Sequence, residues 1–231
     1  MKIVGVISSP NPNDSTATLV REVLNGAADE GVTVTEIYLP KFQIEFCKGC
    51  SKCTAEGRCP IPDDFESLKS IIYGADGIIW SSPTYAWSMN AMLKRFLERL
   101  GVYEILTSSL GGKYMVGIST CGSFGAKKVA KNLVELTSNG IFQRSYISGF
   151  LALGLKGRKI TDNIKGIKQA NQLGRKIVSD IRNLKKYPLQ NLSGRLVNAL
   201  MMRPIFRKII LKQKDARLQA VFINLKQRGV L

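Results

Sequence analysis

The chain has 231 residues, of which 45% are hydrophobic, and it carries a formal net charge of +17 without a single histidine. This length is enough for one sizeable core, while its apolar runs are too short to span a bilayer. The missing histidine excludes Ser-His-Asp and Cys-His catalysis, histidine-ligated zinc and Rieske centres. The charge indicates high solubility or an anionic partner.

The first residues, MKIVGVISS, lack the separate basic, apolar and cleavage regions of a signal peptide. We therefore expect a soluble, cytoplasmic protein. In that compartment the five cysteines are not expected to form a disulfide framework, because thiols are kept reduced.

Predicted strands and helices alternate along the first 186 residues. Short β-branched or apolar runs predict five strands: Lys2–Ser9, Thr33–Leu39, Gly77–Ser82, Tyr114–Ser119 and Ile141–Ile147. Apolar residues at helical spacing predict five helices: Thr16–Glu30, Phe65–Tyr73, Ser88–Leu100, Ala126–Ser138 and Asp162–Lys185. This alternation predicts an α/β domain over 1–186, a doubly wound five-stranded parallel sheet with a cysteine-rich loop inserted at 41–64.

Two helix caps are also predicted. Ser15 or Thr16 is expected to cap the first helix, and Asp63 or Asp64 the second, because these side chains accept hydrogen bonds from free N–H groups.

Residues 187–231 are predicted to form a basic, amphipathic, helical C-terminal extension, with nine lysine or arginine residues and one acidic residue, Asp215. Apolar residues recur at helical spacing through Asn191–Lys212, where Pro204 is expected to break or kink the helix. A second short helix is expected from Leu218 to Leu225. We expect the extension to dock on the domain or on a partner subunit. A basic amphipathic stretch can also lie on an anionic membrane, whereas nucleic acid is not expected, because no reading module is recognised.

Three loops follow strands one, three and four, and in an open parallel sheet ligands bind at such carboxyl ends. The first, SSPNPNDSTA, places hydroxyl groups at a helix N-terminus, which suits a phosphate or a plain helix cap. It is neither GxGxxG nor a Walker loop. The second, SPTYAWS, offers aromatic rings, and the third, TCGSFG, offers small residues that allow close backbone approach. Each has an ordinary structural explanation, but together they suit FMN.

The stretch FCKGCSKCTAEGRCPIPDD contains Cys47, Cys50, Cys53 and Cys59. Its repeated two-residue spacing is typical of the ligands of a cubane cluster. Zinc knuckles instead pair two CxxC motifs that are about 12 to 20 residues apart. With no second cysteine run, Cys59 is expected to complete the same cluster. Zinc or a free-thiol redox switch is the alternative.

The ordered combination of SSPNPNDSTATL, the four cysteines, PIPDDF and ADGIIWSSPTYAWSMNAMLKRFLERL resembles the iron–sulfur flavoproteins. These are flavodoxin-like proteins of the NAD(P)H-dependent FMN reductase group. The resemblance covers about residues 1–150 and implies FMN together with one [4Fe–4S] cluster on Cys47, Cys50, Cys53 and Cys59. The residues it implies for the FMN phosphate are Ser9, Asn11, Ser15, Thr16 and Ala17. Those it implies for the isoalloxazine ring are Pro83, Thr84, Tyr85, Trp87, Thr120, Cys121, Gly122 and Ser123.

We therefore expect a flavin-dependent oxidoreductase, or electron-transfer flavoprotein, that couples two-electron flavin chemistry to one-electron carriers. The cofactors carry the chemistry, so no catalytic side chain is expected. Ferredoxin or NAD(P)H is the expected redox partner, and the resemblance implies a homo-oligomer. The alternatives are a cluster-free NAD(P)H-dependent FMN or quinone reductase, and a non-catalytic flavodoxin-like electron shuttle.

Overall fold

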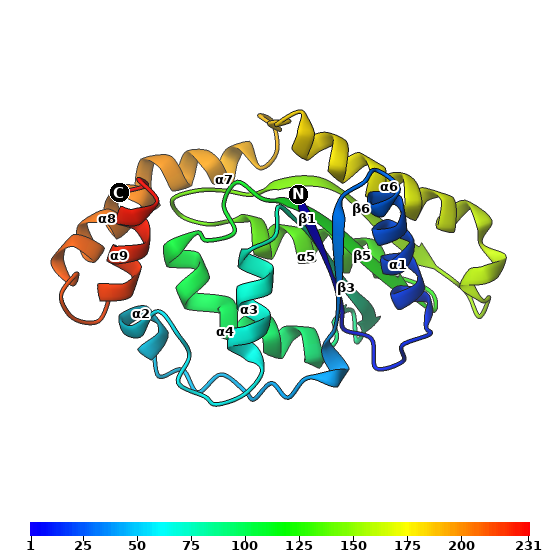
Figure 1. The fold of residues 1–231 in the computed structure, drawn as a ribbon, viewed down its shortest axis with the longest axis horizontal. Coiled ribbons are helices and arrows are strands. Elements are labelled where there is room, and N and C mark those ends of the chain that lie inside the picture. The colour runs from blue at the N-terminus through cyan, green and yellow to red at the C-terminus, as the bar shows by residue number, and fades with distance from the viewer.

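Five parallel strands form the central sheet of the computed structural model, which describes residues 1–231 (Figure 1). Their order is β2-β1-β3-β5-β6, which is the flavodoxin-like doubly wound order that the sequence predicts. A short β4 (Ser88–Met89) pairs antiparallel with the end of β3. The parallel strands are β1 (Lys2–Ile7), β2 (Thr33–Tyr38), β3 (Gly77–Tyr85), β5 (Tyr114–Cys121) and β6 (Tyr146–Gly154).

Helices cover both faces of this sheet and create two main apolar clusters. On one face, α1 (Ser15–Ala28) and α6 (Ile164–Arg182) bury side chains against the sheet. These two helices approach closely at Gly174, where a Cβ would lie 2.0 Å from the Val23 carbonyl oxygen. The helices that pack on the opposite face are α3 (Phe65–Tyr73), α4 (Ala91–Thr107) and α5 (Ala126–Ser138).

The prediction of a strand at Ile141–Ile147 is wrong, because β6 begins only at Tyr146 and continues to Gly154. Ile141 and Phe142 are buried as a strand would require, but they pack in a third cluster with the C-terminal extension. The apolar pattern therefore identified buried residues correctly and their secondary structure incorrectly.

Two helix starts also differ from the prediction. The predicted helix from Ser88 begins at Ala91, because residues 88–89 pair with β3 and the Asn90 side chain caps the helix by accepting from Leu93 N–H. The first helix is capped by Asp14, not by Ser15 or Thr16.

The cysteine-rich segment follows a 3₁₀ turn, η1 (Leu39–Lys41), and contains one short helix, α2 (Lys52–Glu56). A second 3₁₀ turn, η2 (Ile160–Asp162), precedes α6. In Figure 1 the cysteine-rich segment passes below α3 and α4 and reaches α2 beside α9 (Gln219–Gln227), near the end of the chain.

The extension runs along the outside of the domain through α7 (Leu192–Val197), the π-helical turn η3 (Asn198–Met202) and α8 (Arg203–Lys212). Pro204 was expected to break or kink this helix, but the helix continues through it without a break. The preceding turn widens to a π-helix, in which the Arg203 N–H donates to the Asn198 carbonyl oxygen, and Pro204 falls in the first turn of α8, where its missing N–H is tolerated. No helix in the structure is both long and apolar enough to cross a membrane.

Candidate functional site

The three loops that follow β1, β3 and β5 are joined by side-chain hydrogen bonds at the carboxyl edge of the sheet. The Thr16 and Thr120 hydroxyl oxygens lie 2.7 Å apart, which connects the start of α1 to the end of β5. The Ser8 hydroxyl donates to the Ser81 carbonyl oxygen across 2.8 Å, and the Asn90 amide donates to the Ser8 carbonyl oxygen across 2.6 Å. The loops therefore form one continuous surface.

The loop after β3 is a tight hairpin that presents two aromatic rings. Tyr85 pairs with Ser88, and the two residues between them, Ala86 and Trp87, both have positive φ, 47° and 63°. Such turns normally contain glycine or asparagine, and strained non-glycine residues cluster at functional sites. Tyr85 is 52% exposed and Trp87 is 66% exposed, so both rings are accessible to a flat ligand.

The loop after β5 packs against this hairpin and leaves open space at its tip. At Gly125, where φ is 101°, a Cβ would lie 3.2 Å from the Trp87 ring. The Thr84 and Ser119 hydroxyl oxygens are 2.9 Å apart. At Gly122, by contrast, nothing lies within 4 Å of the Cβ position. Backbone at this glycine can therefore approach a planar group, which fits the isoalloxazine part of FMN.

The loop after β1 fits a phosphate less simply. The Asp14 carboxylate accepts from the Ala17 N–H at 2.8 Å and from the Ser9 hydroxyl at 2.6 Å. A helix N-terminus favours an anion, but here a carboxylate already supplies negative charge. A phosphate bound at this terminus would therefore lie beside Asp14.

The structure places all the residues predicted to bind FMN on these three loops or directly beside them. They differ in accessibility, however. The exposed ones are Asn11, Tyr85, Trp87, Gly122 and Ser123, and the half-buried ones are Ser15 and Thr84. The buried ones are Ser9, Thr16, Ala17, Pro83, Thr120 and Cys121. At least Thr16 and Thr120 use their hydroxyl groups to hold the loops together.

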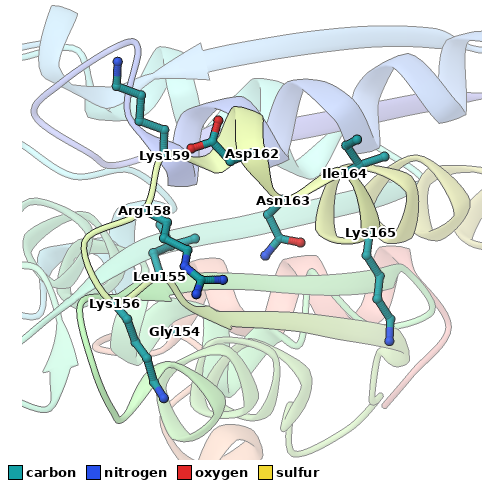
Figure 2. Close-up of a pocket in the computed structure, with 9 residues that line it drawn as sticks. All are labelled: Gly154, Leu155, Lys156, Arg158, Lys159, Asp162, Asn163, Ile164 and Lys165. Atoms are coloured by element: carbon teal, nitrogen blue, oxygen red, sulfur yellow. The ribbon is translucent and has the colours of Figure 1, made fainter.

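A basic hollow that the sequence analysis missed lies beside the third loop, between β6 and the start of α6. Its volume is about 550 Å³ (Figure 2). It is lined by four basic residues, Lys156, Arg158, Lys159 and Lys165, against one acidic residue, Asp162. In Figure 2 the side chains of Lys156, Arg158 and Lys165 extend toward the same side, whereas Lys159 points away from them. The run LKGRK was the signal in the sequence.

The basic hollow is attached to the third loop by two main-chain hydrogen bonds. The Leu155 N–H donates to the Cys121 carbonyl oxygen at 2.9 Å, and the Lys156 N–H donates to the Gly122 carbonyl oxygen at 2.7 Å. None of the four basic side chains takes part in an ion pair. Their charges are therefore available to an anion bound next to the expected flavin position.

The cysteine-rich segment is held by charged side chains, which the sequence analysis also missed. Arg99 on α4 forms a buried ion pair with Asp63, with Nη1 and Oδ2 2.7 Å apart, and also donates to the Glu45 carbonyl oxygen. Burial alone would raise the pKa of Asp63, but hydrogen bonds from Arg99 and from main-chain N–H groups lower it. Asp63 thus anchors the segment, and its Oδ1 accepts from the Phe65 N–H at 3.1 Å at the start of α3.

The return of the segment to α3 is fixed in a similar way. Glu66 accepts a hydrogen bond from the Cys59 N–H at 2.8 Å, and Lys69 donates to the Gly57 carbonyl oxygen at 3.2 Å. At its beginning, Phe46 stacks under Arg95 of α4, whose guanidinium carbon lies 5.1 Å from the ring centroid.

The four thiols of this segment are near one another but do not converge. Cys47 and Cys50 are exposed, and Cys53 and Cys59 are half-buried. Burial raises the pKa of the Cys53 thiol, and the charges of Cys59, Cys50 and Cys47 raise it further. No three cysteine or acidic side chains are close enough together to hold a metal ion. The donor chemistry fits an iron–sulfur cluster, whereas closure around one requires the exposed half of the loop to move.

The C-terminal extension covers one side of α2. The buried Thr54 hydroxyl donates to the Arg217 carbonyl oxygen at 2.8 Å. Cys53 packs against the third apolar cluster, to which α9 contributes Val221 and Leu225. Residues more than 150 positions apart in the sequence therefore meet at the cysteines.

Comparison with known proteins agrees with this arrangement. Residues 1–154 match the family described as NADPH-dependent FMN reductase. An iron–sulfur flavoprotein of Methanocaldococcus jannaschii is 31% identical over 199 residues, covering 80% of this chain and 100% of the relative. An iron–sulfur flavoprotein of Clostridioides difficile is 26% identical, covering 90% of this chain and 93% of the relative.

Solved structures show the same fold. An NAD(P)H:quinone oxidoreductase from Methanothermobacter marburgensis superposes with a TM-score of 0.61 at 16% identity, covering 77% of this chain and 97% of that one. An archaeal flavodoxin gives a TM-score of 0.52 at 16% identity, covering 79% and 99%.

Proposed function

This chain belongs to the NADPH-dependent FMN reductase family and, within it, to the iron–sulfur flavoproteins, and from that premise we propose an FMN-dependent oxidoreductase that serves one-electron carriers through a [4Fe–4S] cluster. FMN supplies two-electron and one-electron chemistry when bound, and such a cluster supplies one-electron chemistry. The proposed contribution of the protein is to place these cofactors.

The observation that carries this proposal is the continuous surface of the three loops. Tyr85 and Trp87 would contact one side of the isoalloxazine ring, and the backbone around Gly122 would approach it from the other loop. Ser9, Asn11, Ser15, Thr16 and Ala17 remain the residues we propose for the phosphate, with Asp14 as a neighbouring charge that lowers affinity.

Flavin affinity tests this placement directly. FMN and riboflavin are titrated into flavin-free full-length protein, with quenching of flavin fluorescence as the signal. We expect FMN to bind more tightly than riboflavin. Asp14→Asn, which keeps the helix cap, should tighten FMN several-fold by removing about 1 kcal/mol of like-charge repulsion, and should leave riboflavin unchanged. Equal affinity for the two flavins in both proteins would exclude a phosphate at this position.

We propose that the basic hollow binds the phosphate groups of a reduced nicotinamide donor. Its volume is in the range of small-molecule and cofactor pockets, and Lys156, Arg158 and Lys165 line it without ion pairs. Arg158→Glu should raise the KM for NADPH about tenfold or more while kcat changes little, because a positive contact becomes a negative one. Lys186→Glu, an exposed charge reversal beyond the far end of α6, should not change the KM. A protein reduced only by ferredoxin would contradict this donor.

The four cysteines are the proposed cluster ligands. The start of their segment lies near the three loops, because Phe46 contacts Arg95, five residues after the Asn90 cap that ends the aromatic hairpin, which is about 8 Å along a helix. Anaerobic preparation with quantified iron, sulfide and flavin tests the cluster. About four irons and four sulfides per chain are expected. Replacing any one of the four cysteines by serine should lower both the iron and the sulfide content.

A cluster-free NAD(P)H-dependent FMN or quinone reductase is the second candidate, and the open arrangement of the thiols favours it. A yellow, iron-free protein obtained under strictly anaerobic conditions, with full NADPH turnover, would select this candidate. Absence of turnover with either NADPH or reduced ferredoxin would instead indicate an electron shuttle.

We also propose a homo-oligomer. Val102 and Ile105 of α4 and Leu136 of α5 are about half exposed and line an apolar hollow of about 390 Å³, which a second copy would cover. Sedimentation velocity should give a mass above one chain, and Ile105→Glu should reduce it to the monomer.

A further inference from the structure

The segment formed by α7, η3 and α8 carries an exposed apolar stripe. Neither α7 nor η3 buries any residue, and α8 buries only Ile210. Along the stripe Leu196 is 54% exposed, Leu200 75%, Ile205 50% and Ile209 38%. Contiguous exposed apolar surface of this kind marks an interaction site.

Basic residues border this stripe and no acidic residue opposes them. Between residues 191 and 212 the sequence has five arginine or lysine residues and no aspartate or glutamate. Lys208 follows Ile205 by three positions and Lys212 follows Ile209 by three, so each lysine lies next to an apolar side chain on the helix surface. Neither lysine forms an ion pair.

We propose that this stripe lies on the surface of an anionic lipid bilayer. Helices that bind in the plane of a membrane bury an apolar face at the headgroup boundary and direct lysine and arginine to anionic headgroups. The long lysine stems can lie along the apolar layer while their ammonium groups reach the phosphates. Each basic residue near such a surface adds to the electrostatic attraction.

Two other partners for this stripe, a second copy of the chain and a nucleic acid, are disfavoured. In a twofold dimer the same patch would meet itself, which would place basic residues of one copy against those of the other. Nucleic acid would satisfy the charges through its phosphates, but it would leave the apolar stripe in water.

Vesicle sedimentation of the full-length protein tests the proposal. Vesicles of phosphatidylcholine with about 30% phosphatidylglycerol should carry the protein down, and pure phosphatidylcholine vesicles should not, because binding depends on surface charge. Lys208→Glu/Lys212→Glu should weaken binding by roughly tenfold or more. Leu200→Glu/Ile205→Glu should abolish it, since both side chains are exposed and the fold does not depend on them.

Matched variants on another surface are the controls. Lys127→Glu/Lys128→Glu and Ile71→Glu change exposed residues of α5 and α3, and both should bind the anionic vesicles like the unchanged protein. Equal sedimentation with both vesicle types, or stripe variants that bind normally, would overturn the proposal. So would a protein that ignores vesicles but dimerises through the stripe or binds a DNA duplex.

Discussion

The three loops proposed to bind FMN, called the flavin loops below, and the cysteine-rich segment are held in place by different kinds of interaction. The loops after β1, β3 and β5 are joined by short hydroxyl groups and main-chain atoms of neighbouring strands, such as Thr16 with Thr120. The cysteine-rich segment depends on long charged side chains and on a distant part of the chain, as in the contacts of Asp63 with Arg99 and Thr54 with Arg217.

This difference teaches which part of the site can change independently. The flavin loops are extensions of the sheet, so they keep their places as long as the sheet exists. The cysteine-rich segment is an insertion whose position depends on α3, α4 and the extension. Variants that loosen the cysteine-rich segment should therefore leave the flavin loops intact. Variants that loosen the flavin loops should likewise leave the cysteine-rich segment intact.

Breaking the buried ion pair is expected to have the largest effect. Arg99→Met would leave Asp63, whose side chain is 4% exposed, as a buried charge without its partner, at a cost of about 3–5 kcal/mol. Urea denaturation should show this loss, and Lys94→Met, which removes an exposed pair with Glu98, should cost less than about 1 kcal/mol. Adding Asp63→Asn to Arg99→Met should recover part of the stability. A loss no greater than that of Lys94→Met would show that the pair does not anchor the segment.

A pH-dependent effect is expected at Glu104, which lies on α4 beneath the extension. Burial raises the pKa of Glu104 from 4.5 to about 7, although the Leu110 N–H and the charges of Arg228 and Lys113 oppose the rise. The folded protein thus binds a proton that the unfolded chain has released. Stability should therefore fall as pH rises from about 4.5 to 7, by up to about 1.4 kcal/mol per pH unit.

Glu104→Gln should remove this slope. Denaturation of both proteins across that range gives the difference, and Glu98→Gln, on the same helix but exposed, is the matched control. Parallel stability curves for the variant and the unchanged protein would contradict the assignment.

The next smaller effect is expected in the flavin loops. Thr16→Val should cost about 1–3 kcal/mol, because it leaves the buried Thr120 hydroxyl without its partner, and it should weaken FMN binding. Thr16→Ser, which keeps the hydroxyl, should restore most of both. The rate of alkylation of Cys53 should be the same in both variants as in the unchanged protein. A faster rate in Thr16→Val would show that the flavin loops and the cysteine-rich segment are coupled.

The smallest effect is expected where the extension meets α2. Thr54→Val removes the hydrogen bonds of the hydroxyl to the Arg217 and Ser51 carbonyl oxygens and should cost about 1 kcal/mol. Alkylation of Cys53 should become about fivefold faster while FMN affinity is unchanged. Thr54→Ser should behave like the unchanged protein. An unchanged alkylation rate would mean that apolar contacts with α9 alone cover the thiol.

Much of the sheet and the meeting of the three loops at its carboxyl edge were predictable from local patterns. The bounds of α3 and α5 follow from apolar periodicity and turn residues, and the alternation of strands and helices predicts the doubly wound parallel sheet. The meeting of the three loops follows because carboxyl ends of parallel strands share one edge. Ile141–Ile147 was predicted wrongly because burial against the extension resembles burial in a sheet.

The sequence by itself thus determined which segments are buried, in what order they alternate and where four thiols stand close together. Only the tertiary structure decided that Arg99 anchors the cysteine-rich segment, that a basic hollow adjoins the third loop and that α9 covers Cys53. The physical reason is separation along the chain. Periodicity and caps act within a few residues, whereas these contacts join groups up to 163 positions apart, and local sequence does not specify the partner.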